Sequence, residues 1–225
     1  MLFTNSIKFN TSGWEPLEKA QRITLNLKSD HCLVWKNDVP DLLSLNFFPL
    51  PPDIPVDLNS LGELRNFYRE SVQQAGGGLV SVDRFSIQGV STIQTLFKFP
   101  QKPHGMVYIG SLIFPFVDFS YAIKVQCQEY GVTGMRDAII FALHHQSLPI
   151  EVDQNQQVKG WLQDPYDPTR QDPIMRNLSE DEKYDVDFPS HPLSRTRQYL
   201  AKIRSSLEFS REILQLVTCE QDLCR

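Results

Sequence analysis

Hydrophobic and polar residues alternate in short runs along the first part of the chain. In Arg22–Lys28, an isoleucine and two leucines occupy every second position, which predicts a strand with one buried face. His31–Lys36 and Leu42–Phe48 continue as a second and a third strand. Prolines between residues 49 and 55 cannot donate ladder hydrogen bonds, so this stretch is expected to cross the surface in an extended form.

The next segment carries the spacing of an amphipathic helix over Ser60–Ala75. Ser60 and Glu63 fit a capping box, in which each side chain binds a free amide at the start of the helix. Apolar residues then recur every three or four positions, as one helical face requires. Three glycines at 76–78 end this helix. They follow a helix rather than precede one, so phosphate binding there is not expected.

Four more alternating runs and a second helix come after the glycines. The runs cover residues 79–87, 90–99, 106–114 and 119–127, and the helix covers Thr133–Gln146. The sequence therefore predicts an α+β fold with a mainly antiparallel sheet, helices packed on it, and a C-terminal extension ending in a helix. Because both helices carry an apolar stripe, we expect them to pack on the same face of the sheet.

The last third of the chain differs in composition. Between Glu151 and Ser190, ten acidic residues face four basic ones, and prolines interrupt any periodicity. Trp161, Tyr166, Tyr184 and Phe188 argue against a solvated tail, because such tails are poor in aromatic residues. We expect these side chains to dock on the preceding domain.

A third helix begins at Ser190 or His191, with Pro192 in its first turn. Its apolar stripe and basic remaining faces predict an amphipathic helix that folds back on the domain. The expected organisation is a domain over 1–148, an acidic, proline-containing arm over 149–190, and a basic C-terminal helix over 191–225. The predicted stripe comprises Leu193, Leu200, Ile203, Leu207, Leu214 and Val217.

Charge and hydropathy limit the possible partners. The net charge is −5, which disfavours sequence-independent binding to nucleic acid, because such binding needs clustered cations. No apolar run reaches the roughly 20 residues that span a bilayer. Residues 1–14 lack the pattern of a signal peptide, and no cysteines form a CxxC pair, so a reducing, cytoplasmic location is expected.

Chemical motifs do not stand out. The chain has no GxSxG, HExxH, Walker or dinucleotide-binding pattern. His144 and His145 are adjacent on a helix and point about 100° apart, so they suit the helix C-terminus better than a metal. Cys219 and Cys224 lack further ligands at zinc spacing. We expect no catalytic residues, metal or cofactor, although Asp83, Asp118 and Glu129 are carboxylates near strand ends.

Exposed aromatic and basic residues are the candidates for a binding surface. Trp35 lies on a short strand beside polar neighbours, and Phe116 belongs to an aromatic group around one turn. Phe188, Arg195 and Arg197 surround the start of the third helix, where the arginines could meet a partner's carboxylate or phosphate. Any sheet face that the helices leave open is expected to be a groove for a peptide or an apolar helix.

The opening Ile7-Lys8-Phe9 followed by Gly13-Trp14 is similar to the short strand and tryptophan-containing start of the Mog1/PsbP/DcrB-like fold group. The single helix after the first strands and the closing helix also resemble that group, over residues 1–148. The resemblance implies an α/β sandwich and mostly non-enzymatic roles, as adaptors, chaperones or partner-binding subunits. It assigns no functional residues.

Two functions therefore remain open from the sequence. The first is a non-enzymatic adaptor or chaperone-like module that recognises a protein partner. The second is an enzyme of undetermined class with a carboxylate or histidine site assembled in space. A deep pocket with convergent polar groups would favour the enzyme, whereas an apolar patch or shallow groove would favour the adaptor.

Overall fold

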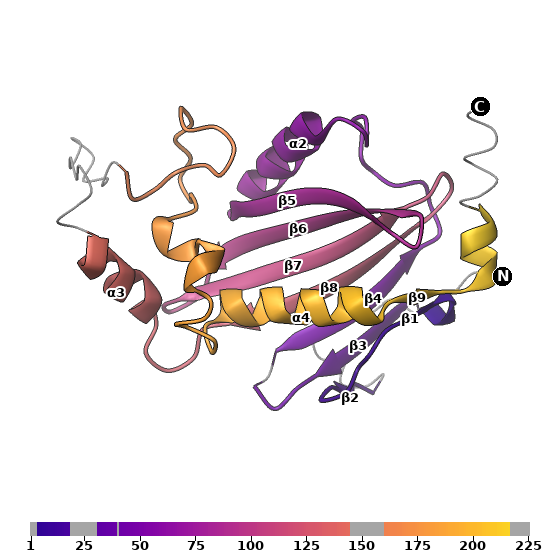
Figure 1. Ribbon diagram of the computed structural model, residues 1–225, viewed down its shortest axis with the longest axis horizontal. Helices are drawn as coiled ribbons and strands as arrows, with labels where there is room; N and C mark the ends of the chain where they lie inside the picture. Colours follow the sequence, from indigo (N-terminus) through magenta and orange to yellow (C-terminus); the bar gives the residue numbers. More distant parts are fainter. Residues whose placement is uncertain (1–3, 19–30, 40, 145–159, 217–225) are drawn as a thin grey trace.

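A seven-stranded antiparallel sheet forms the centre of the molecule, in the strand order β2-β3-β4-β8-β7-β6-β5 (Figure 1). The computed structural model describes residues 4–18, 31–39, 41–144 and 160–216. The α+β fold predicted from the sequence is confirmed. The strands of this sheet are β2 (Glu15–Pro16), β3 (Cys32–Lys36), β4 (Leu42–Phe48), β5 (Gly78–Ile87), β6 (Val90–Pro100), β7 (Met106–Pro115) and β8 (Ser120–Gln128).

The alternating runs predict β3 to β8 to within one or two residues at their ends. Each alternating residue faces one of two layers, because successive side chains of a strand point to opposite faces. The strand predicted at Arg22–Lys28 lies outside the described residues. The short edge strand β2 has no alternation long enough to be predicted, and it pairs with β3 through Pro16 and Trp35.

Helix α2 (Leu61–Gln74) begins at the predicted cap, with Ser60 Oγ accepting a hydrogen bond from the amide of Glu63. The other half of the predicted capping box is not formed, because the Glu63 carboxylate accepts from the amide of Asp57 instead of that of Ser60. Its buried residues include Leu64, Tyr68 and Val72, which pack against β5 and β6. The chain turns at Gly76, whose φ of 76° is a left-handed conformation that favours glycine. Helix α2 therefore covers the β5 end of one sheet face.

Helix α4 (Pro192–Ser206) covers the opposite face and lies across β7 and β8 (Figure 1). Leu193, Leu200 and Ile203 belong to the largest apolar cluster, with residues of β4, β7 and β8. A methyl group at Gly110 would lie 2.6 Å from side-chain atoms of Leu200 and Thr196. This glycine thus allows the helix to approach the sheet closely.

The predicted helix over 191–225 is shorter than expected. Helix α4 ends at Ser206, and the chain continues in the extended strand β9 (Glu208–Phe209). Strand β9 pairs with β1 (Ile7–Lys8), which follows a 3-10 turn, η1 (Thr4–Ser6). Phe209 packs edge-on against Phe114, with ring centroids 5.2 Å apart. Burial of this aromatic ring and the strand pairing account for the interruption, after which helix resumes at 211–216.

Helix α3 (Met135–His144) does not share the face of α2, so the prediction of two helices side by side is wrong. It packs mainly against the 3-10 turn η2 (Leu178–Glu180) at one end of the molecule (Figure 1). Arg136 and Ile140 form its buried side. The stripe expected to face the sheet is therefore partly exposed, at Met135, Ile139 and Leu143.

The acidic arm docks on the sheet and helices through buried ion pairs, over its described part at 160–190. Arg69 of α2 makes two hydrogen bonds with Asp164, at 2.7 and 2.8 Å. Lys98 of β6 lies 2.7 Å from the fully buried Glu180. Aromatic residues of the arm contact the domain as well: Trp161 packs on Phe141. A second 3-10 turn, η3 (Glu182–Tyr184), completes the arm.

Candidate functional site

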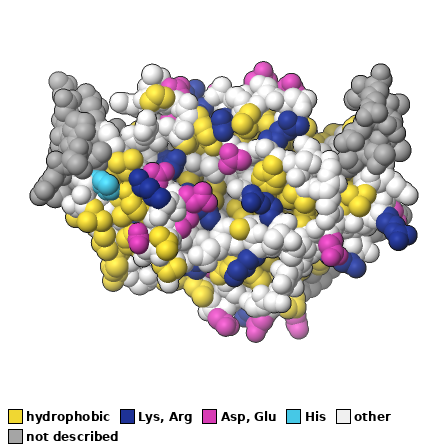
Figure 2. Space-filling model, viewed as in Figure 1, with side chains coloured by type: hydrophobic (Ala, Val, Ile, Leu, Met, Phe, Trp, Pro, Cys, Tyr) yellow, Lys and Arg dark blue, Asp and Glu magenta, His cyan; other side chains and the backbone are white. Residues whose placement is uncertain are grey.

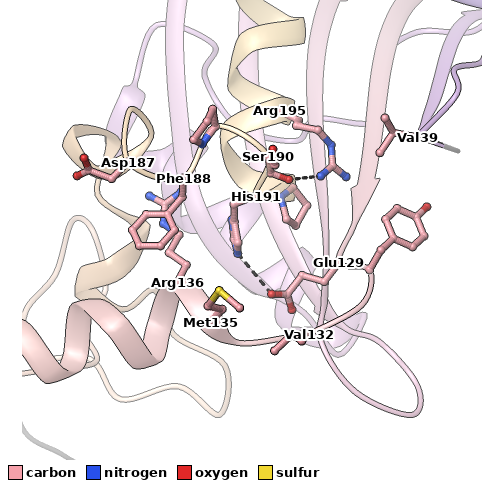
Figure 3. A pocket seen from close by; sticks show the side chains of 13 residues that line it. Val39, Glu129, Val132, Met135, Arg136, Asp187, Phe188, Ser190, His191 and Arg195 are labelled. Carbon is pink, nitrogen blue, oxygen red and sulfur yellow. Dashed lines mark hydrogen bonds and ion pairs between the residues drawn. The ribbon is translucent and has the colours of Figure 1, made fainter.

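A pocket of about 500 Å³ opens where the β8–α3 loop meets the start of α4 (Figure 3). The β8–α3 loop, the first turn of α3, the end of the acidic arm and the first turn of α4 form its walls. It is lined by Val39, Glu129, Tyr130, Val132, Met135, Arg136, Asp187, Phe188, Pro189, Ser190, His191, Pro192 and Arg195.

His191 and Glu129 form the polar pair at the centre of this pocket, where the two side chains point toward one another (Figure 3). His191 Nε2 lies 3.5 Å from Glu129 Oε1. His191 Nδ1 accepts a hydrogen bond from the amide of Leu193 at 3.3 Å and so caps α4. Because Nδ1 is an acceptor, the neutral ring carries its hydrogen on Nε2, facing the carboxylate.

Glu129 is held as a carboxylate. Burial favours its protonated form, but hydrogen bonds from His191 and from the amides of Gly134 and Met106 outweigh burial, and the pKa of Glu129 is lowered. The two amide bonds measure 3.0 and 2.8 Å. Glu129 thereby fixes the loop that leads into α3 against the start of β7.

Arg195 forms the wall on the α4 side and is paired within the chain. Its Nε and Nη2 atoms bind the two oxygens of the buried Asp41 at 2.9 and 2.8 Å. A third bond joins Nη2 to the carbonyl of Gln128 at 3.0 Å. A two-point guanidinium–carboxylate contact fixes the side chain firmly, so Arg195 is a structural wall of the pocket.

Arg136 reaches beneath the pocket and is fully buried. Its guanidinium donates to the Ser179 carbonyl at 2.6 Å, to Asp185 at 2.9 Å and to Ser194 Oγ at 2.8 Å. The ring of Phe188 lies over it, 5.8 Å from the guanidinium carbon. The arm, α3 and α4 thus meet at one cation, which shares the Asp185 carboxylate with Arg197.

The rim of the pocket is apolar and continues onto α3. Val132 is 74% exposed, Met135 49% and Leu143 68%, and Ile139 and Tyr130 are also exposed. Figure 2 shows hydrophobic side chains gathered over the α3 end of the molecule. We call these five residues, Tyr130, Val132, Met135, Ile139 and Leu143, the α3 surface. Contiguous apolar surface beside a pocket is typical of a protein interaction site.

In this geometry the pocket histidine does not present its Nδ1 lone pair to the cavity. A general base needs a lone pair that faces the substrate, and the Nδ1 lone pair of His191 is used by the Leu193 amide. Arg195 is paired with Asp41, and Arg136 shares the Asp185 carboxylate with Arg197. Among residues 4–18, 31–39, 41–144 and 160–216, no cluster of histidine, cysteine or acidic residues could hold a metal ion.

Two of the five predicted binding residues, Phe188 and Arg195, line this pocket. The expectation that Arg195 and Arg197 are free for a partner is wrong. Arg197 binds both oxygens of Asp185, at 3.0 and 3.1 Å, and the Glu180 carbonyl at 2.7 Å. The acidic arm supplies these acceptors, and sequence spacing does not reveal that the arm returns to the helix.

Trp35 and Phe116 lie away from the pocket. Phe116 is 5% exposed and stacks on Phe119, with centroids 4.6 Å apart, so it belongs to the core. Trp35 is half-buried and packs edge-on against Phe9. The apolar cluster under α4 takes up both side chains, and the predicted binding role of Phe116 is not supported.

The sequence pattern does not predict His191 as a pocket residue or the exposed side of α3. It marks Glu129 as a carboxylate near a strand end and His191 as a possible helix start. The two are 62 positions apart in the chain, and no local pattern links residues at such a separation. The basic residue Arg136 inside an apolar stripe was the one available signal that α3 buries a different side.

Comparisons with known proteins leave the family open. No family model and no curated protein matches the chain. A solved structure from Bacteroides thetaiotaomicron VPI-5482 is similar at 8% identity with a TM-score of 0.36. The match covers 58% of this chain and 41% of that one, so the chain spans less than half of its neighbour's length. No helix within the described part of the chain is long and apolar enough to cross a membrane.

Proposed function

We propose that this protein is a non-enzymatic binding module, an adaptor or chaperone-like subunit, that recognises a protein partner through the α3 surface and the pocket beside it. One observation carries the proposal. Apolar side chains are exposed around a pocket in which Arg195 is paired with Asp41 and Glu129 contacts His191. The resemblance to partner-binding proteins of the Mog1/PsbP/DcrB-like group implies a role of the same kind.

The chemistry of the surface defines the expected contact. Arg195 is already bound to Asp41 and Glu129 to His191, so neither needs an ionic ligand. Met135, Val132 and Phe188, by contrast, offer apolar area. Methionine and aromatic residues are enriched at protein interfaces, and anchors fill pockets near the centre of such interfaces. The partner is therefore expected to insert one large apolar side chain into the pocket and to lay further apolar surface on α3.

The test replaces the exposed residues by charges. Val132→Asp and Ile139→Asp should leave the melting temperature unchanged, because both side chains are exposed. A photo-crosslinking residue at Met135 would identify the partner, and the affinity of the purified partner would then be measured by calorimetry. Each substitution should weaken binding at least tenfold.

Val117→Asp is the matched control, since Val117 is 68% exposed at the β7–β8 turn, which lies at the other end of the sheet from α3 (Figure 1). It should bind the partner like the unmodified protein. Equal affinity of all three variants would contradict the proposal, as would a partner crosslinked equally well from Val117.

The alternative is an enzyme with a site assembled in space, and His191 with Glu129 is the observation that favours it. An acid–base role would require His191 to release the Leu193 amide during the reaction. Turnover of a hydrolase substrate panel that disappears in His191→Gln but survives in Arg197→Lys would establish this function in place of the first.

A further inference from the structure

The residues that the structure describes cover the sheet face opposite α4 only in part. Helix α2 packs on β5 and β6, and α3 packs mainly against η2 instead of the sheet. A hollow of about 390 Å³ remains over β3, β4, β8, β7 and β6. We call it the open-face hollow; it is lined by Val34, Leu42, Ser44, Asn46, Phe97, Phe99, Ile109, Ser111, Lys124 and Gln126.

The hollow has apolar sides and a polar centre. Ser44, Lys124 and Ser111 stand in one row, because Lys124 of β8 is directly opposite Ser44 of β4 and Ser111 of β7. Val34 of β3 continues this row beyond Ser44, and Phe97 and Ile109 belong to the next row, together with Gln126. A single cation thus stands between two hydroxyl groups, within an apolar trough.

Lys124 is the unusual member of this row. Lys98 and Arg69 are buried and paired with Glu180 and Asp164, whereas Lys124 is exposed. Lys124 has no ion-pair partner among the residues that the structure describes, and no acidic residue lines the hollow. Its ammonium group can therefore meet an anionic ligand without displacing a carboxylate that lines the hollow.

The Ser44 hydroxyl group can donate a hydrogen bond to the same anionic ligand. Its Oγ accepts a hydrogen bond from the amide nitrogen of Asn46 at 3.0 Å, which leaves the hydroxyl hydrogen free to donate. The Lys124 ammonium group adds further donors. Carboxylate oxygens accept such charge-assisted bonds well, and these bonds are stronger than neutral ones.

We propose that the open-face hollow binds a free straight-chain carboxylate, with its head at Lys124 and Ser44 and its tail along Phe97, Phe99 and Ile109. The volume falls within the roughly 300–1,000 Å³ of small-ligand pockets, which are mostly apolar with a few placed polar groups. The site is independent of the α3 surface.

A peptide strand fits this hollow less well. Added strands pair with a sheet edge, whereas the hollow lies on a face whose backbone groups are already bonded between neighbouring strands. An apolar helix laid here would bury the Lys124 charge without a partner, which is costly. A ligand with one carboxylate and one apolar tail meets both demands.

The experiment is a calorimetric titration of the full chain with dodecanoate, repeated with dodecan-1-ol. Dodecanoate should bind with one-to-one stoichiometry, and the alcohol at least tenfold more weakly. Lys124→Met keeps the apolar stem and removes the charge, so it should weaken dodecanoate binding about tenfold or more without changing alcohol binding. Its melting temperature should be unchanged, because Lys124 is exposed.

Lys202→Met is the control, since Lys202 is an exposed lysine of α4 on the other side of the sheet. It should bind dodecanoate like the unmodified protein. Absence of binding, equal affinity for acid and alcohol, or equal losses in both lysine variants would each overturn the proposal. In an NMR titration with dodecanoate, chemical-shift changes confined to α3 would also overturn it, since the ligand would then occupy the α3 surface.

Discussion

The two faces of the sheet differ in how completely the chain covers them. Under α4, apolar side chains interlock with the sheet, and the charged groups along its edge are paired with the acidic arm. On the opposite face, among the described residues, α2, the segment 54–58 and Tyr166 pack over β5 and β6, and the exposed Lys124 stands over the middle strands. The same strands thus pack closely against α4 on one face and, in the described part of the chain, are partly exposed on the other.

The largest expected effect is on the covered face. Leu200→Asp should lower the free energy of unfolding by on the order of 5 kcal/mol, because Leu200 is 1% exposed and the new carboxylate would be buried unpaired. Ile109→Asp on the open face should cost clearly less, since that residue is only half-buried. Urea unfolding of both variants measures the difference, and similar costs would remove the distinction between the faces.

The two lysines give the next largest contrast. Lys98→Met leaves the fully buried Glu180 without its cation and should cost about 3 to 5 kcal/mol. Tyr108 still donates to Glu180 at 2.7 Å and limits this loss. Lys124→Met should change stability by about 0.5 kcal/mol or less. Thermal melts of the two variants compare them directly, and a large loss for Lys124→Met would show that this lysine is structural.

A smaller effect concerns pH. The folded state lowers the pKa of Glu129 below its usual value of 4.5, so its contribution to stability is present above that value. This contribution is lost as the pH falls through the lowered pKa. Glu129→Gln should therefore reduce stability at pH 7 and flatten its decline in acid, as measured by melts between pH 3 and 7.

Asp118→Asn is the control for that series. Asp118 is an exposed carboxylate in the β7–β8 turn. Its replacement should leave the acid decline in place. An acid decline as steep in Glu129→Gln as in the unmodified protein would assign it to other groups, of which Glu180 also has a lowered pKa through its contact with Lys98.

Local patterns predicted the strands well because each strand carries its own signal. Alternation located β5 to β8, and Ser60 marked the start of α2, since both depend on neighbours in the sequence. The site was predicted only in part. Phe188 and Arg195 belong to the pocket, but the partners of Arg195 depend on a contact with Asp41, 154 residues away.

The position of α3 shows why such contacts escape sequence reasoning. Its apolar stripe suggested burial on the sheet, yet the helix buries Arg136 instead. Carbonyl and carboxylate acceptors from the arm bind that guanidinium at several points, and these bonds offset the free-energy cost of burying its charge. The periodicity of a helix shows which of its sides is apolar. It does not show that hydrogen-bond acceptors 40 or more residues further along the chain fold back onto that helix.

The pairing of β1 with β9 joins residues 7–8 to residues 208–209, so this part of the fold can form only late in synthesis. The ribosome releases β3 to β8 before α4, so the apolar face that α4 covers is exposed for roughly several seconds at 5–20 residues per second. Only the synthesis of residues 192–209 lets the helix cover that face and lets β9 join β1. Nascent chains stalled before α4 should consequently need a chaperone, and completed chains should not.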